Sequence, residues 1–190
     1  MRHGLRWVRS TSWCAGRPAT SSAGDMSPNG FKTVVDIDLI GSFNASRAAF
    51  NQLKETKGII LYISAGMAYM PYAFQVHVGA AKAGIEQLMQ NLALEWGKYG
   101  IRSCSIVPGP IEGTEGMKRL ADPKSLAERL SHIPLSRMGT VDEIGAAAVF
   151  LASPMAAYIT GAQLIVDGGS GLIGSAFFNV GAETVLRSGA

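Results

Sequence analysis

The sequence predicts a protein of the α/β class, in which parallel strands are covered by helices. Three short apolar runs have the length and composition of strands, at residues 59–63, 101–107 and 163–166. Segments with helical spacing of apolar residues alternate with these runs, most clearly at 31–53 and 78–99. Helices that alternate with short apolar strands are typical of a parallel sheet joined by helical crossovers.

The first predicted helix, at residues 31–53, has a broad apolar side. Its members recur at helical spacing: Val34, Val35, Leu39, Phe43 and Phe50. Lys57 and Gly58 end the helix, and the run at 59–63 follows. That run is almost continuously apolar, which favours a strand that is covered by helices on both faces.

The second helix, at 78–99, has a buried side of its own and ends at Gly100, which suits a C′ position. The buried side consists of Ile85, Leu88, Met89, Leu92 and Trp96. After the strand at 101–107, a weak helix is predicted near Leu126. A firmer one at 141–151 has two acids in its first turn. The strand at 163–166 is the last element.

Composition and charge exclude several classes of function. The 190 residues carry 17 basic and 14 acidic side chains, but residues 1–24 contain four arginines and no acid. The rest of the chain is therefore nearly neutral and lacks the basic face that nucleic acid requires. No apolar stretch is long enough to span a membrane. Cys14 and Cys104 form no disulfide framework, and no residue is assigned to a metal.

Residues 1–26 differ in character from the rest. Arginine, serine and threonine dominate, and no sustained helical or alternating period is present. This composition fits a mitochondrial transit segment, and it fits equally well a new start created by truncation or by an alternative exon. We therefore divide the chain into an atypical or disordered leader, residues 1–26, and a domain, residues 27–190.

The run Val-Gly-Ala-Ala-Lys-Ala-Gly-Ile at 78–85 places Lys82 at the start of the second helix. Pro-Gly-Pro-Ile follows the second strand at 108–111, and Val-Asp-Gly-Gly closes the third at 166–169. This order resembles the short-chain dehydrogenase/reductase family. In that family a tyrosine four residues before the lysine donates a proton, and a serine thirteen residues before the tyrosine assists it. Here those places hold Val78 and Ala65.

Within this family the chain resembles the 2,4-dienoyl-CoA reductases, chiefly the peroxisomal group, over residues 28–175. The matching runs lie at 31–38, 75–84, 108–116, 118–120 and 158–169. The resemblance implies that Lys82 holds the ribose of NADPH. Asp38 takes the place of an asparagine that relays protons through water. The resemblance also implies that Arg119 reaches the phosphates of coenzyme A. The implied cofactor contacts are Pro108, Gly109, Pro110, Ile111 and Thr114.

The missing tyrosine is compatible with this chemistry. Reduction of a ketone needs a proton donor at the carbonyl oxygen. A dienoyl thioester can instead take hydride at the far end of its conjugated system, which leaves charge on the thioester oxygen. Hydrogen-bond donors stabilise that oxygen, and a water ordered by Asp38 and Lys82 can then protonate carbon.

Several polar residues near this site also fit ordinary structural roles. An aspartate within a helix, such as Asp38, is usually a surface residue. Tyr69, Tyr72 and His77 flank the predicted site and any of them could donate a proton, although a loop packed by its aromatic rings is the simpler account. The glycines at 169–174 match G-x-G-x-x-G, but too few residues follow for a crossover helix, so we expect a loop there.

No Gly-rich strand–turn–helix precedes residue 58, so the pyrophosphate cradle is not in this chain. The sequence therefore predicts the C-terminal part of a Rossmann-like doubly wound parallel sheet, with about three strands and flanking helices. We expect an N-terminally truncated form that is inactive alone and binds no NADPH. We also expect one edge of the strand at 59–63 to be unpaired.

The expected function is NADPH-dependent reduction of 2,4-dienoyl-CoA, a fatty acyl-CoA, in the β-oxidation of unsaturated fatty acids. The resemblance also implies a homo-oligomer and a peroxisomal location, although the chain does not end in a Ser-Lys-Leu-type signal. The alternatives are another short-chain oxidoreductase or a non-catalytic subunit that associates with the full-length enzyme.

Overall fold

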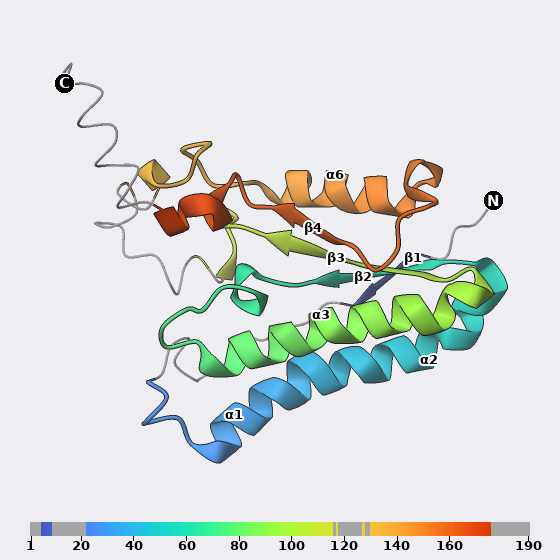
Figure 1. Cartoon of the computed structure of the whole chain (residues 1–190), viewed down its shortest axis with the longest axis horizontal. Helices are drawn as coiled ribbons and strands as arrows, with labels where there is room; N and C mark the ends of the chain where they lie inside the picture. The colour runs from blue at the N-terminus through green and yellow to red at the C-terminus, as the bar shows by residue number, and fades with distance from the viewer. Residues whose placement is uncertain (1–4, 9–21, 116, 118–126, 128–129, 176–190) are drawn as a thin grey trace.

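The computed structural model describes residues 5–8, 22–115, 117, 127 and 130–175. Four parallel strands form one sheet in which sequence order and spatial order coincide (Figure 1). The strands are β1 (Leu5–Val8), β2 (Ile59–Ile63), β3 (Arg102–Pro108) and β4 (Gln163–Val166). The three predicted strands are confirmed as β2, β3 and β4.

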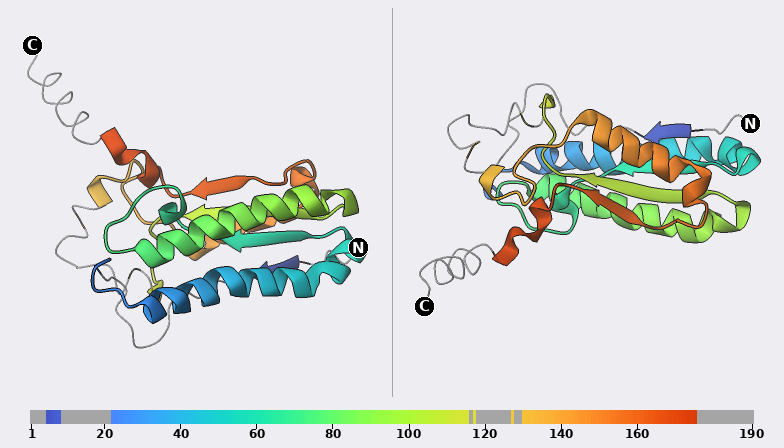
Figure 2. Two further views of the ribbon diagram at one scale, coloured as in Figure 1. Left: turned by 60° about the horizontal axis from the view of Figure 1, so that its bottom comes forward. Right: turned by 90° about the horizontal axis from the view of Figure 1, so that it is seen from above.

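Helices cover both faces of this sheet. α1, α2 and α3 lie on one face and α6 lies on the other, as Figures 1 and 2 show. Their bounds are α1 (Pro28–Val35), α2 (Gly41–Thr56), α3 (Val76–Trp96) and α6 (Val141–Ala152). Short 3-10 turns, η2 to η5, occupy Gly66–Ala68, Gly97–Tyr99, Pro154–Ala156 and Ser170–Ser175. The helix expected near Leu126 lies outside the described residues. Among those residues, no helix is both long and apolar enough to cross a membrane.

The strand β1 was not predicted. It pairs in parallel with β2, with Leu5 opposite Ile59 and Val8 opposite Tyr62. The prediction that this edge of β2 is unpaired is therefore wrong. Residues 5–8 read Leu-Arg-Trp-Val, which is compatible with a strand. Four residues are too few for a periodic signal to distinguish a strand from its irregular surroundings.

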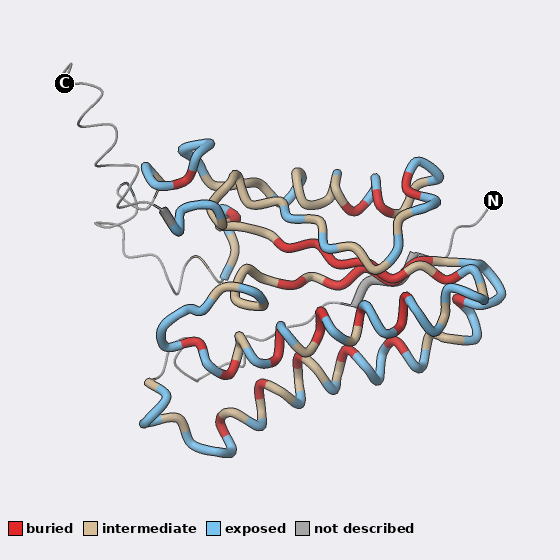
Figure 3. The backbone as a smooth tube through the Cα atoms, in the orientation of Figure 1, coloured by how far each residue is buried: buried red, intermediate tan, exposed pale blue. Residues whose placement is uncertain are grey.

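The core consists of two layers, one on each face of the sheet. Ile60 and Tyr62 of β2 pack with buried residues of α2 and α3, whereas Ile59 and Leu61 pack against α6. This alternation follows from the period of two along a strand. The buried stretches of β2 and β3 run through the centre of the molecule in Figure 3. The prediction of a strand that is covered on both faces is confirmed.

The predicted helix at 31–53 is not a continuous α-helix. A π-helix, η1 (Asp36–Ile40), separates α1 from α2. The Ser42 hydroxyl donates to the Asp38 carbonyl at 2.5 Å, and the Ser46 hydroxyl donates to the Ser42 carbonyl at 2.7 Å. Serines that bond back to such carbonyls bend helices, and π-turns occur frequently at functional sites. This turn leaves the Asp38 side chain fully buried.

Candidate active site

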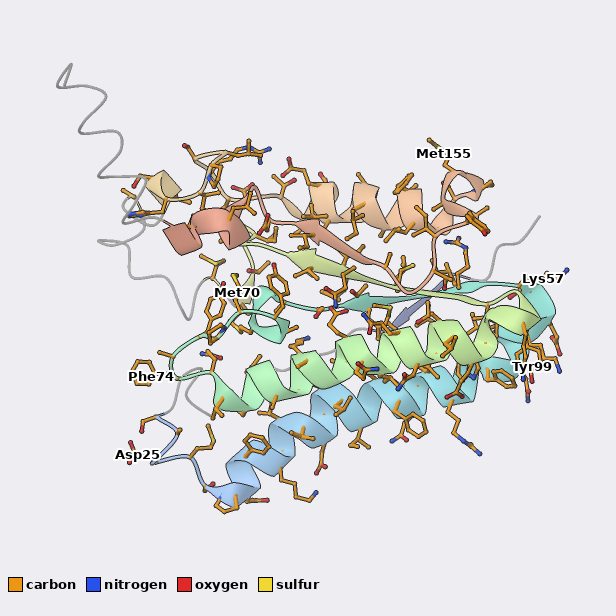
Figure 4. The ribbon with its side chains drawn as sticks, in the orientation of Figure 1. Asp25, Lys57, Met70, Phe74, Tyr99 and Met155 are labelled. Carbon is orange, nitrogen blue, oxygen red and sulfur yellow. The ribbon has the colours of Figure 1, made fainter. Side chains whose placement is uncertain are left out.

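The carboxyl ends of β2, β3 and β4 meet at one edge of the sheet. Met70 and Phe74, in the loop between β2 and α3, lie at this end of the molecule, whereas Lys57 and Tyr99 lie at the other (Figure 4). Lys82 points to the same edge, because its Nζ donates to the carbonyl of Ile63, the last residue of β2, at 3.1 Å. Ligands of open parallel sheets bind outside these carboxyl ends.

The structure brings Asp38 and Lys82 together, as the sequence predicted. Lys82 Nζ lies 3.8 Å from Asp38 Oδ2, and the two side chains are 6% and 0% exposed. The distance is that of an ion pair rather than of a direct hydrogen bond. Burial lowers the pKa of Lys82, and the negative charges of Asp38 and Glu86 oppose that shift. A buried ammonium held by carboxylates is typical of functional sites.

Several buried polar atoms around this pair have no hydrogen-bond partner within the described part of the chain. They are both carboxylate oxygens of Asp38, Ser64 Oγ, His77 Nδ1 and Glu86 Oε1. Burying such atoms without a partner is costly, so each calls for an explanation. All of them come from η1, from the residue after β2 or from α3. These segments surround Lys82, so the unsatisfied atoms mark a candidate site for a polar ligand.

Sequence reasoning missed Ser64 and Glu86. Glu86 lies one turn after Lys82 and is 5% exposed, and its Oε2 accepts a hydrogen bond from Ser105 Oγ at 2.7 Å. A signal for it was present, because an acid between the apolar residues Ile85 and Met89 interrupts the buried side of the helix. Ser64 gave no signal beyond its place directly after a strand.

Val78 occupies the place of the family's tyrosine. It is half-buried in the first turns of α3, four residues before Lys82, so the two side chains share one side of the helix. The two loop tyrosines that could replace it, Tyr69 and Tyr72, are 42% and 46% exposed. Burial raises the pKa of Tyr69, and the Asp167 charge adds to that rise. His77, in contrast, lies inside, with 6% of its surface exposed.

The last residue of β3 and the loop after it contain the other predicted cofactor contacts and lie at the same edge. The Gly109 N–H donates to the Val166 carbonyl at 3.0 Å. Thr114 Oγ1 donates to the Ile111 carbonyl at 2.8 Å, which folds the loop back on itself. Arg119, the predicted contact for coenzyme A, lies outside the described residues.

The glycines at 169–174 form no phosphate cradle. The Asp167 carboxylate accepts hydrogen bonds from the Gly169 and Gly171 amides, at 2.8 and 2.7 Å. These donors are therefore already used, and η5 follows instead of a crossover helix, in agreement with the loop that the sequence predicted.

A cavity of about 460 Å³ borders this loop on the α6 side of the sheet. Pro110 and Ile111 contribute to its wall, together with Arg137 and Glu143, which are paired with each other at 2.6 Å. Neither Asp38 nor Lys82 lines it. The cavity therefore touches one part of the predicted cofactor loop but is separate from the buried polar cluster.

A parallel sheet whose carboxyl edge holds a buried lysine, on a helix that follows a strand, suits the binding of a nucleotide cofactor. Residues 11–171 match the family model described as enoyl-(acyl carrier protein) reductase. With this match over most of its length, the chain belongs to the short-chain dehydrogenase/reductase family.

Relatives are found among curated proteins and among solved structures. The chain is 52% identical over 153 residues to a peroxisomal 2,4-dienoyl-CoA reductase of Saccharomyces cerevisiae, and 44% identical over 161 residues to one of Pongo abelii. These matches cover 80% and 84% of the chain but 52% and 55% of the relatives, so the chain spans about half their length. A gluconate 5-dehydrogenase of Burkholderia cenocepacia, solved with NADP and tartrate, superposes with a TM-score of 0.76 at 27% identity. That match covers 82% of the chain and 62% of the dehydrogenase.

Proposed function

We propose that Asp38 and Lys82 serve an NADPH-dependent reduction of 2,4-dienoyl-CoA thioesters in the oxidation of unsaturated fatty acids. Membership of the short-chain dehydrogenase/reductase family supports the broader part of this proposal, that the protein is an oxidoreductase. The substrate and a peroxisomal location are supported by the names of the relatives in Saccharomyces and Pongo. Because the chain spans about half of those relatives, the activity of the whole protein is a proposal.

One observation carries the proposal: Lys82, which is paired with the buried Asp38, lies on the same side of α3 as Val78. A ketone reductase needs a hydroxyl at the place of Val78 to protonate the carbonyl oxygen. A site that retains the lysine, adds a buried carboxylate and lacks this hydroxyl suits a reaction in which carbon is protonated. A conjugated thioester is such a substrate, because its reduction leaves charge delocalised between oxygen and carbon.

The carboxyl edge of the sheet fits a nicotinamide cofactor. Lys82 presents an ammonium there, Gly109 places no side chain over the edge, and Ser64 adds a buried hydroxyl without a partner in the described part of the chain. NADPH, when bound, supplies the hydride. Lys82 would hold its ribose. The residues that would lie against it, at the end of β3 and in the loop that follows, are Pro108, Gly109, Pro110, Ile111 and Thr114.

The side chains of this site then have distinct tasks. The Lys82 ammonium contributes positive charge beside the reacting carbons, and such preorganised charge is worth most where water is excluded. The Asp38 carboxylate orients that ammonium and, together with it, would order a water that gives carbon its proton. Arg119 would bind the phosphates of coenzyme A by charge-assisted hydrogen bonds.

An assay of a chimera tests this function. Residues 28–175 would be joined to the part of the Saccharomyces relative that the chain does not match. We expect this chimera to oxidise NADPH with a medium-chain 2,4-dienoyl-CoA and not with a panel of ketones. The 190-residue chain, measured in parallel by calorimetry, is expected to show no NADPH binding, because it lacks the Gly-rich cradle.

Two outcomes would each contradict a part of this proposal. Turnover of ketones without turnover of the dienoyl thioester would identify another short-chain oxidoreductase. Binding of NADPH by the 190-residue chain at micromolar affinity would show that the cradle is dispensable. The unmatched part of the Saccharomyces relative alone serves as the control for background oxidation of NADPH.

We also propose that the protein assembles through α2 and α3 of two copies. Apolar side chains remain exposed on the segment from η1 to α2, where Ile40 and Phe43 are 45% and 44% exposed, and on α3, where Leu94 is 84% exposed. Apolar surface of this kind commonly marks an interaction site. A second copy could cover both helices at once through a two-fold axis.

Light scattering at micromolar concentration tests this association. We expect an oligomer for the unsubstituted chimera and a smaller species for Phe43→Glu, because a buried unpaired charge disfavours the interface. Met155→Glu, at a position that is 82% exposed beyond α6, is the matched control and leaves the size unchanged. A monomeric unsubstituted protein would exclude the proposed assembly.

A further inference from the structure

Phe74 has an unusual backbone conformation for a bulky residue. It is the third residue of the turn from Tyr72 to Gln75, which the Gln75 N–H closes by donating to the Tyr72 carbonyl at 3.3 Å. Its φ is 65°. Turns that need a positive φ at this position favour glycine or asparagine there, because other side chains crowd the backbone. A bulky residue that keeps such a conformation is a reason to look for a function.

The ring of Phe74 is exposed as well as strained in its backbone. The residue is 59% exposed and lies at the tip of the loop between β2 and α3 (Figure 4). An exposed apolar ring and a strained backbone both cost free energy, and asparagine at this place would relieve both. Burial in the core therefore does not explain why a phenylalanine stands here.

Phe74 belongs to a larger apolar surface at the carboxyl edge of the sheet. The loop between β2 and α3, the first residue of α3 and η5 contribute to it. A Cβ at Gly171 would lie 3.2 Å from Tyr69 Oη and 3.7 Å from Met70 Cε, so η5 packs on this loop. Apolar surface of this kind commonly marks an interaction site. The members of this edge surface, which are 41% to 77% exposed, are Tyr69, Tyr72, Phe74, Val76, Leu172 and Ile173.

The edge surface adjoins the buried Asp38–Lys82 pair. Val76 begins α3, and Lys82 follows six residues later, which is about 9 Å along the helix axis. Side chains of a helix lean toward its N-terminus, so the ammonium is closer still. The Lys82 ammonium also points to the carboxyl edge, where it donates to the Ile63 carbonyl. A ligand at this edge can therefore contact the ammonium and the edge surface at once.

The substrate of the proposed function has three parts, which are coenzyme A, the conjugated thioester and a hydrocarbon chain. Arg119 is proposed for the first part and Lys82 for the second. The hydrocarbon chain is attached to the reacting carbons and so begins beside Lys82. It is apolar, and its transfer from water to an apolar surface is favourable.

We propose that the edge surface binds the hydrocarbon chain of the acyl-CoA substrate and that Phe74 determines the preference for longer chains. The inference rests on the proposed function. The strained turn holds the Phe74 ring outward, and the bound chain covers it. Short chains end before they reach the ring, so its contribution grows with chain length.

Calorimetry on the 190-residue chain tests the edge surface without catalysis. Saturated acyl-CoA thioesters are the probes, because they lack the conjugated double bonds that accept hydride. Each fully buried CH₂ group strengthens binding about fourfold, so decanoyl-CoA should bind more tightly than butanoyl-CoA. Phe74→Asn should lower this preference about 10-fold. It should also raise the Tm of the unliganded chain by about 2–4 °C, because asparagine adopts a positive φ readily.

Lys57→Asn is the matched control. Lys57 also has a positive φ, of 51°, but it lies at the opposite end of the molecule (Figure 4). This substitution should raise the Tm in the same way and leave the preference for decanoyl-CoA unchanged. Phe74→Leu is the conservative variant. It keeps an apolar side chain in the strained turn, so it should retain most of the preference.

The chimera extends the test to turnover. There Phe74→Asn should lower kcat/KM for a ten-carbon 2,4-dienoyl-CoA more than for a six-carbon one. An unchanged preference between decanoyl-CoA and butanoyl-CoA would overturn the inference, whatever the chimera does. A change in oligomer size by light scattering with that preference unchanged would identify a second copy as the occupant, and would overturn it as well. If the preference falls as expected but the chimera reduces no dienoyl-CoA, the proposed function is wrong and the site for an acyl chain stands.

Discussion

Replacement of Lys82 by methionine is expected to lower kcat of the chimera by about 10²–10³-fold, which is the loss found when one group that stabilises developing charge is removed. The Lys82 ammonium lies 3.1 Å from the Ile63 carbonyl and 3.8 Å from Asp38, so the substitution removes the positive charge from the buried pair. Methionine keeps an unbranched stem and fills the same space. Steady-state oxidation of NADPH with a dienoyl-CoA measures the effect.

The same substitution should also destabilise the protein. Removal of one partner of a buried ion pair costs about 3–5 kcal/mol, because the other charge stays buried without compensation. The double variant Asp38→Asn with Lys82→Met removes both charges, so we expect it to recover much of the stability. It should not recover turnover. Urea unfolding of both variants separates the two effects.

Either of two results would contradict the catalytic role proposed for Lys82. Near-normal turnover of Lys82→Met would show that the ammonium is not needed. Recovery of turnover in the double variant would show that the loss in the single variant came from instability alone. Val78→Tyr is a further check, since a hydroxyl at that place should not improve dienoyl reduction if carbon rather than oxygen is protonated.

Gly109→Ala is expected to destabilise the protein by about 1–3 kcal/mol, the usual cost of forcing an atom into a packed region. A Cβ at Gly109 would lie 2.6 Å from Asp167 Cα and 2.8 Å from its carbonyl oxygen. Those are backbone atoms of the loop after β4, so they cannot rotate away. The carboxyl ends of β3 and β4 must separate, and the predicted cofactor loop must move with them.

Gly145→Ala is the matched control, because it adds the same methyl group but is expected to change the stability in the opposite direction. Gly145 lies inside α6, and a Cβ there would meet nothing within 4 Å. Alanine in a helix interior is favoured over glycine by about 1 kcal/mol. Thermal unfolding should therefore show a lower Tm for Gly109→Ala and a higher one for Gly145→Ala. Equal shifts in Tm would show that the close approach of Gly109 to Asp167 does not destabilise the Gly109→Ala variant.

The pairing of Asp38 with Lys82 could be predicted because one residue stands in a local pattern and the other at a place that the family resemblance singles out. Lys82 was found from a strand, a short glycine-containing run and a helix in register, whereas Asp38 was named only from the family resemblance, since a mid-helix aspartate is usually a surface residue. The structure brings this pair together. The neighbours Ser64 and Glu86 were missed, because a serine after a strand and an acid on a helix are ordinary in sequence. Their unsatisfied buried atoms become visible only when other elements cover them.

The sequence by itself determined the class of fold, the order of β2, β3 and β4 and the helices between them, because apolar periodicity is a local property of the chain. Only the tertiary structure decided that β1 pairs with β2, that a π-turn carries Asp38 into the interior and that His77 lies inside while Tyr69 remains exposed. These features depend on contacts between segments far apart in the chain. The free energy of burying a polar group is set by what surrounds it and not by its neighbours in sequence.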